Sequence, residues 1–214
     1  MEFNELIQDR FSCRALSDRE IPHESLDRIF DAARVAPTAV NKQPFKIWAV
    51  ENPEAREKLA ETTNYTFGAG VFLVVGGKAD EAWIRQYDGR NFADVDASIV
   101  ATYIMLAIHN EGLRSTWVGH FDAPKLKEAF PQMADYDLIA IFPIGYATEK
   151  GVPSARHTQR KAAAEIVEVL QQSSAYKRVF LSPFDITGLL HEFLASCSSP
   201  VASAAKYLKE SLIK

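Results

Sequence analysis

The sequence predicts a mixed α/β protein with one main domain. Two apolar runs, residues 71–75 and 138–142, are typical of buried strands because they are short and end at glycine or proline. Segments whose apolar residues recur at helical spacing lie before, between and after these runs. A chain of 214 residues with 47% hydrophobic content can bury one sizeable core but leaves little room for a second full domain.

Two amphipathic helices are predicted near the N-terminus. The first is short and carries Phe3, Leu6 and Ile7 at helical spacing. The second follows a capping box formed by Ser17 and Glu20 and ends near Ala36, before Pro37. Its first turn holds Pro22, and its apolar face comprises Leu26, Ile29, Phe30 and Ala33.

Between these helices lies the stretch Arg10-Phe11-Ser12-Cys13-Arg14, which we call the arginine ladder. Side chains of an extended chain alternate sides, so Arg10, Ser12 and Arg14 face one way while Phe11 and Cys13 face the core. Two guanidinium groups beside a hydroxyl suit a phosphate group. Taken alone, this stretch fits an ordinary half-buried strand with a solvated basic face better, so the rest of the chain has to decide.

Residues 36–45 predict an ordered loop, with a proline near each end and small or amide side chains between. Its backbone and the amides of Asn41 and Gln43 could recognise the polar edge of a ligand, or could satisfy the loop's own backbone. The sequence leaves both interpretations open.

The rest of the core alternates strands and helices. Residues 94–111 predict a helix that is apolar on almost all sides, which is easier to bury if a second subunit covers part of it. Gly76-Gly77 ends the first apolar run and lacks the spacing of a phosphate-binding loop. The other predicted elements are a strand at 45–50, a helix at 53–62, an extended stretch at 113–118, a helix from Ala123, and two helices after Ser182.

The composition restricts location and partners. A net charge of -4 and a pI near 5.8, with scattered basic residues, argue against a nucleic-acid binder. The start of the chain is not a secretory signal, and the most apolar stretch, residues 99–108, is far shorter than the ~20 residues of a membrane span. Cys13 and Cys197 show no metal-type spacing and are expected to be reduced thiols. We therefore expect a soluble cytoplasmic protein.

No metal site, nucleophile or general acid or base stands out in the sequence. Ser98, His120 and Asp122 lack the frame of a catalytic triad, and His23, His109 and His191 have no partner motif. The basic residues of the ladder and the amides of the loop can bind a ligand, but the sequence shows no obvious acid, base or nucleophile. This combination indicates that a bound organic cofactor carries the chemistry.

Five segments, in this order, resemble the FMN-dependent nitroreductase family. They are the arginine ladder, Ala36-Pro37-Thr38-Ala39-Val40-Asn41-Lys42-Gln43-Pro44-Phe45, Trp117-Val118-Gly119, Ile144-Gly145-Tyr146 and Arg160-Lys161. The resemblance implies an α+β sandwich, with a central mixed sheet flanked by helices, in an interlocked homodimer. It covers residues 1–170, the expected FMN-binding domain, and leaves residues 171–214 as a C-terminal helical extension of unknown role.

The resemblance also assigns site residues. Arg10, Ser12 and Arg14, with Phe11 beside them, would hold the phosphate and ribityl end of FMN together with Arg160. Pro37, Thr38, Ala39 and Asn41 would come from the partner subunit and lie along the flavin. Val118, Gly119 and His120 would lie at the reactive edge of the ring, where a glycine permits close approach.

Two positions depart from the family pattern. Thr158 stands where many members have a lysine, so His157 or Lys161 would have to supply the missing charge at the phosphate. His120 replaces a small or acidic residue and would either donate a proton or narrow the pocket.

The reaction implied is hydride transfer from NADH or NADPH to FMN, followed by reduction of a nitroaromatic, a quinone or another small acceptor by a ping-pong mechanism. No side chain is assigned a catalytic role. The alternatives are a reductive dehalogenase or flavin-fragmenting relative on the same fold, and a non-catalytic FMN-binding protein.

Overall fold

The structure, a computed structural model, describes residues 2–170. The chain divides into two compact units, Met1–Thr158 and a second that begins at Gln159. The described part of the second unit contains the short helix α6 (Ala163–Ile166). The two helices predicted after Ser182 lie outside the described residues, and the predicted domain boundary at residue 170 stays a prediction.

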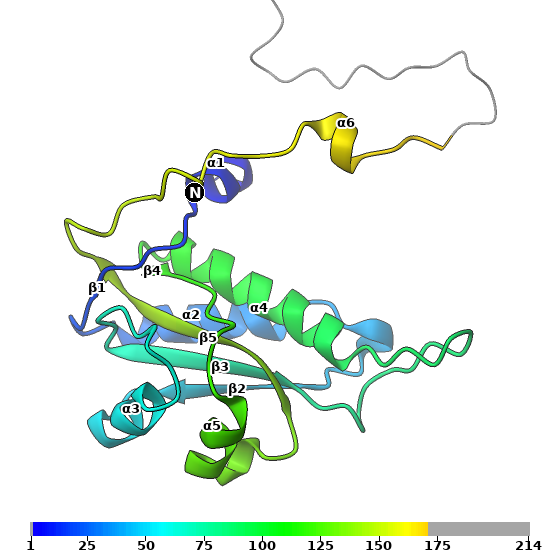
Figure 1. Ribbon diagram of the computed structural model, residues 1–214, viewed down its shortest axis with the longest axis horizontal. Coiled ribbons are helices and arrows are strands. Elements are labelled where there is room, and N and C mark those ends of the chain that lie inside the picture. Colours follow the sequence, from blue (N-terminus) through cyan, green and yellow to red (C-terminus); the bar gives the residue numbers. More distant parts are fainter. Residues whose placement is uncertain (1, 171–214) are drawn as a thin grey trace, which may run out of the picture. The chain divides into compact units, whose positions relative to one another are not determined.

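The first unit is built on a sheet of five strands, ordered β1-β5-β3-β2 with β4 also pairing with β5 (Figure 1). The strands are β1 (Leu16–Ser17), β2 (Phe45–Val50), β3 (Val71–Gly77), β4 (Arg114–Ser115) and β5 (Asp137–Ala147). All ladders between these strands are antiparallel. Within residues 2–170, parallel pairing occurs only at an isolated bridge between Ser12 and Ser115.

The expected mixed sheet therefore needs correction for this part of the chain. Alternation of helices and strands does not by itself fix strand direction, because a connection that includes a helix can return the chain either way. Between β2 and β3 the helix α3 (Pro53–Ala60) is short, and the segment after it brings β3 back antiparallel to β2.

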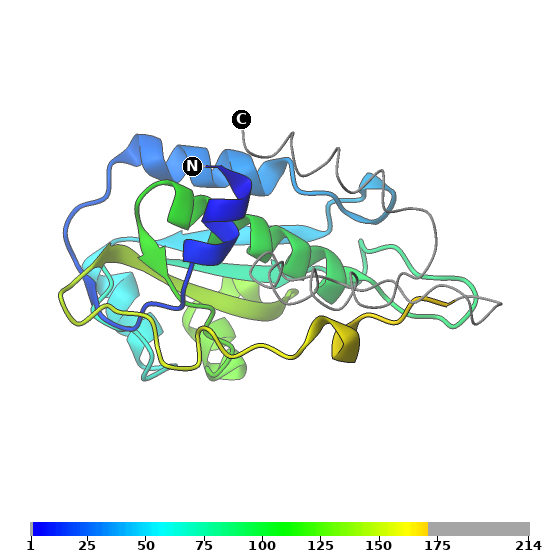
Figure 2. The same cartoon turned by 90° about the horizontal axis from the view of Figure 1, so that it is seen from above.

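Helices cover both faces of the sheet (Figures 1 and 2). Helices α2 (His23–Arg34) and α4 (Ala93–Asn110) pack on one face, while α3 and α5 (Ala123–Ala129) pack on the other. Alternate residues of β3 enter the two cores, Leu73 and Val75 on one side and Phe72 and Val74 on the other. This burial on both faces explains why the β3 sequence is apolar without alternation.

The predicted helices are confirmed in the described residues, with one error at a helix start. Helix α1 (Phe3–Asp9) forms as expected, and Asp122 caps α5 by accepting the Lys125 N–H at 3.0 Å. The capping box of Ser17 and Glu20 is wrong, because Ser17 pairs in β1 and α2 begins at His23.

Both predicted strand ends near glycine and proline are also wrong. β3 continues through Gly76 and Gly77, and β5 continues through Pro143, which lies opposite Phe72. A Cβ at Gly77 would approach the Ala93 carbonyl oxygen to 2.7 Å, so this glycine allows close contact between the strand and the start of α4. The short helices η1 (Ala39–Asn41) and η2 (Pro131–Met133) complete the described elements of this unit. No helix within residues 2–170 is both long and apolar enough to cross a bilayer.

Candidate functional site

The arginine ladder is extended, as predicted, and joins α1 to β1. Cys13 is fully buried and its neighbour Arg14 is exposed, as expected for opposite sides of an extended chain, whereas Arg10, Phe11 and Ser12 are all partly buried. The Cys13 N–H donates to the Ser115 carbonyl at 2.9 Å, which fixes the ladder against β4. Within residues 2–170 no carboxylate forms an ion pair with Arg14, so its charge is available for an anion.

A pocket of about 180 Å³ opens beside Arg14. The segment after β4 forms one wall, and the connection between α3 and β3 forms another. The lining residues are Arg14, Tyr65, Phe67, Thr116, Trp117, Val118, Gly119 and His120. The structure thus brings together Arg14, Val118, Gly119 and His120, which the sequence had placed in one site from distant parts of the chain.

The backbone at Gly119 faces open space. Val118 and Ile141 exchange two backbone hydrogen bonds of 3.0 Å, which anchor the segment to β5 just before the glycine. A Cβ built on Gly119 would meet no atom within 4 Å. A planar ligand can therefore approach the backbone here without displacing protein atoms.

His120 contributes its ring to the pocket wall. The ring lies edge-on to Tyr65, with 5.6 Å between the ring centroids. The Thr63 hydroxyl donates to the His120 carbonyl at 2.9 Å and holds the backbone in place. This aromatic contact is compatible with a steric role, and the two predicted roles of His120 remain open.

Sequence reasoning missed Tyr65 and Phe67. Phe67 has a φ of 53° and its carbonyl accepts the Leu16 N–H at 2.9 Å, so a left-handed turn brings the aromatic residues to the end of the ladder. The sequence signal that could have identified them is the alternation of aromatic residues with turn-forming residues in Asn64-Tyr65-Thr66-Phe67-Gly68.

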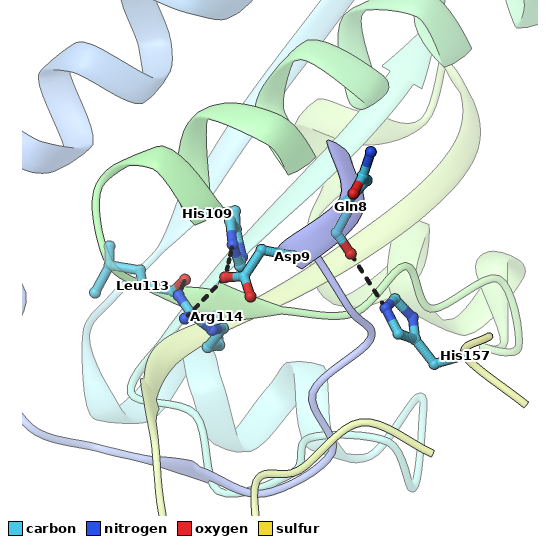
Figure 3. A network of polar contacts seen from close by, with 6 residues as sticks. All are labelled: Gln8, Asp9, His109, Leu113, Arg114 and His157. Carbon is cyan, nitrogen blue, oxygen red and sulfur yellow. Dashed lines mark hydrogen bonds and ion pairs between the residues drawn. The ribbon is translucent and has the colours of Figure 1, made fainter. Parts of the chain in front are cut away.

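A polar network supports the start of the ladder (Figure 3). Buried His109, at the end of α4, lies with Nε2 2.9 Å from the Asp9 carboxylate, and Arg114 approaches the same carboxylate at 3.9 Å. Burial lowers the pKa of His109, the Arg114 charge adds to this effect, and Asp9 opposes it. Since Asp9 directly precedes Arg10, these contacts position the first ladder residue.

The loop with Pro37, Thr38, Ala39 and Asn41 does not line the pocket. It lies at the start of α4 instead, where the Ala39 N–H donates to the Asp96 carboxylate at 2.9 Å. The loop and the pocket of one chain are therefore separate parts of the structure.

Arg160 belongs to the second unit, so its predicted place near the ladder is untested. Its guanidinium donates to the Gln159 carbonyl at 2.8 Å. In the first unit, His157 Nε2 lies 3.3 Å from the Gln8 carbonyl, close in sequence to the ladder (Figure 3). The choice between His157 and Lys161 as the replacement for the missing lysine remains a prediction.

The sequence profile of the Nitroreductase family matches residues 7–65 and 61–146. The chain belongs to the nitroreductase family. A protein of Methanothermobacter thermautotrophicus assigned as an NADH dehydrogenase/NAD(P)H nitroreductase is 31% identical, over 70% of this chain and 79% of that protein. Iodotyrosine deiodinase 1 of Sus scrofa is 23% identical, over 70% of this chain and 62% of the deiodinase.

Solved structures share the nitroreductase fold. A nitroreductase family protein from Clostridium difficile 630 is 33% identical and superposes with a TM-score of 0.73, covering 78% of this chain and 98% of that one. A nitroreductase from Exiguobacterium sibiricum, solved in complex with FMN, is 19% identical with a TM-score of 0.68, covering 79% of this chain and 98% of that one.

Proposed function

We propose that this nitroreductase binds FMN in the pocket beside Arg14 and passes a hydride from NADH or NADPH to a small electron acceptor, such as a nitroaromatic or a quinone. The observation that carries the proposal is a single pocket with, at one wall, a guanidinium that pairs with no carboxylate of residues 2–170 and, at another wall, an open glycine backbone. The relative assigned as an NAD(P)H nitroreductase and the FMN complex of a structural neighbour support it.

The chemistry of the ladder fits the phosphate end of FMN. Arg14 can donate to phosphate oxygens in a charge-assisted pair, and the alternation of an extended chain would place Arg10 and Ser12 on the same side. Ser115, which pairs with Ser12, has a buried hydroxyl oxygen without a hydrogen-bond partner within residues 2–170. Such an orphaned polar group beside a basic cluster favours a polar ligand there.

The pocket wall fits the ring end of FMN. Backbone N–H groups near Gly119 can donate to the ring edge and stabilise negative charge that develops during reduction, so no side-chain base is needed. When bound, FMN supplies the redox chemistry, and nicotinamide and acceptor then use the same pocket in turn. Val118 and His120 would restrict which molecules stack there.

A homodimer would complete this site. Under the proposal, the loop with Pro37, Thr38, Ala39 and Asn41 reaches the pocket of the partner subunit, which agrees with its absence from the pocket lining of its own chain. Exposed apolar side chains on α1 and α4 support an interface, since Phe3 is 64% and Tyr103 38% exposed.

Substitution of Gly119 tests the proposed place of the ring. A Cβ at this position meets only open space in the free protein, so Gly119→Ala is expected to fold with unchanged thermal stability. It should weaken FMN binding at least several-fold if the ring lies against this backbone. Flavin fluorescence titration measures the affinity. Equal FMN affinity of variant and wild type would show that the ring does not lie against Gly119.

A second candidate reaction is reductive dehalogenation, which the similarity to iodotyrosine deiodinase 1 favours. The chain covers 62% of that protein, so the activity does not transfer directly. Release of iodide from iodotyrosine by the reduced protein, compared with turnover of a nitroaromatic, distinguishes the two reactions.

A further inference from the structure

The loop that holds the predicted flavin-facing residues has an unusual backbone. Three non-glycine residues adopt left-handed conformations, Val40 with φ 46°, Asn41 with φ 57° and Gln43 with φ 53°. This conformation is unfavourable for a β-branched side chain such as that of Val40. Backbone strain of this kind persists only where surrounding contacts enforce it, and it concentrates at functional sites.

Asp96 provides one of these contacts from another element. The residue lies in the first turn of α4, is 1% exposed, and accepts the Ala39 N–H on Oδ1 at 2.9 Å. Other parts of the chain also hold the loop, since the Lys78 N–H donates to the Pro44 carbonyl at 2.9 Å and the Lys42 ammonium donates to the Ala82 carbonyl at 3.4 Å. Bonds inside the loop include the Gln43 N–H to the Thr38 hydroxyl. Asp96 is thus the buried link between the strained loop and a long helix.

The second carboxylate oxygen of Asp96 indicates that its burial serves more than the helix. Oδ2 is buried and has no hydrogen-bond partner within residues 2–170. A buried carboxylate with one oxygen unsatisfied is costly, and the N-terminal end of α4 offsets only part of that cost. An acidic residue that served only to start the helix would have a lower desolvation cost at the surface, where its neighbour Asp94 lies.

We propose that Asp96 is a positioning residue for the cofactor. It acts through the Ala39 N–H and holds the loop of residues 37–44 in the strained shape that faces the flavin. The inference rests on the proposed function, under which this loop contacts the FMN of the partner subunit.

The test compares three variants of the full chain: Asp96→Ala, Asp96→Asn and, as a matched control, Asp94→Ala. Asp94 is an exposed acid in the same helical turn, so its removal changes the charge at the start of α4 without touching the loop. Amide hydrogen exchange of residues 38–43 is measured in FMN-free protein, and FMN affinity is measured by flavin fluorescence.

We expect Asp96→Ala to accelerate exchange in the loop and to weaken FMN binding, each by about tenfold or more, since a hydrogen bond to a charged group is lost. Asp96→Asn retains an acceptor oxygen and should restore most of both properties. Asp94→Ala should change neither. If Asp96→Ala does not fold, Asp96→Leu, which keeps the shape without an acceptor, takes its place.

The two proposals fail in different ways. If wild-type protein binds no FMN, the proposed function fails, while loop exchange still decides whether Asp96 holds the loop. If wild type binds FMN and the Asp96 variants match it in both measurements, the positioning role is wrong. Equal effects of Asp94→Ala and Asp96→Ala would contradict it as well, because they would indicate a general effect on the helix.

Discussion

Arg14 is the residue on which the phosphate half of the proposed FMN site depends most. It is exposed, lines the pocket, and forms no ion pair within residues 2–170. Most arginines with this degree of exposure contribute little to stability. A guanidinium without a carboxylate partner at the wall of a pocket is better explained by an anionic ligand.

Replacing Arg14 by alanine should therefore affect the cofactor more than the fold. Loss of a charge-assisted bond to phosphate costs about 1.5–3 kcal/mol, which corresponds to FMN binding weakened roughly tenfold or more. The melting temperature of the FMN-free protein should stay within about a degree or two, as expected for an exposed position. Arg34→Ala, which removes an exposed arginine paired with Asp31 on α2, is the control. Tight FMN retention in Arg14→Ala would show that the ladder is an ordinary strand with a solvated basic face and does not bind the phosphate.

His109 should make stability dependent on pH. Its pKa in the folded protein lies below the ordinary value of 6.5, mainly because of burial, with Arg114 and Arg10 acting in the same direction and Asp9 against it. Below pH ~6.5 the unfolded chain binds a proton that the folded chain binds less readily, so the free energy of unfolding falls as pH falls. Above that range the imidazole is neutral in both states and the effect disappears.

The measurement is urea denaturation of wild type and His109→Gln at several pH values from 5 to 8. The variant cannot titrate at this position, so the wild type should lose more stability on acidification, by at most ~1.4 kcal/mol per pH unit for the one proton. Parallel stability profiles for the two proteins would show that His109 does not titrate in this way.

At the scale of elements, α4 links most of the features described above. Its inner side packs Val100, Ile104 and Ile108 into the core with no exposed surface. Tyr103 on the other side is 38% exposed and lines a second pocket, of about 580 Å³, with Phe3 of α1. The sequence showed a helix apolar on almost all sides, but the first unit buries only part of it.

This uncovered side of α4 predicts a dimer interface. Wild-type protein should sediment as a dimer, and Tyr103→Glu, which places a charge on the exposed apolar side, should shift it toward monomer and lower its FMN content. Thr102→Glu is a useful control, because Thr102 is exposed and its hydroxyl bonds within the helix, to the Ser98 carbonyl. A wild-type protein that sediments as a monomer at micromolar concentration would contradict the interface.

The interiors of these elements could be predicted from the sequence, and several of their ends could not. The periodicity of α2 and the apolar run of β3 follow from burial, which a local pattern records directly. β3 extends through Gly77 because Gly77 pairs with Phe45 of β2 and Asp137 of β5, and the local sequence does not reveal this pairing. Phe67 entered the pocket through a left-handed turn that its residue type disfavours.

The site divides in the same way. Arg14, Gly119 and His120 could be named from the sequence because they occur in segments that resemble a family, and the structure brings them to one pocket. Asp96 could not be named, since its role depends on a contact with Ala39 across more than fifty residues of chain. Residues that act through another residue leave no local motif.

At the scale of the whole molecule, the proposed function requires that the pocket of one subunit meets the loop of another. The first unit contains the ladder and the wall at Gly119, and under the proposed function the loop bonded to Asp96 reaches the pocket of a partner subunit. Cofactor content and assembly should therefore rise and fall together, because each chain would complete the site of the other.

The central claim is that the pocket holds a flavin that nicotinamide can reduce. The most direct measurement mixes purified, FMN-loaded protein anaerobically with NADH and, separately, with NADPH, and follows the visible flavin absorbance by stopped flow. We predict a yellow protein with about one FMN per chain whose absorbance is bleached by at least one of the two donors and restored by a nitroaromatic or a quinone. If the protein retains FMN but neither donor reduces the flavin, the claim is contradicted, and the protein binds FMN without this activity.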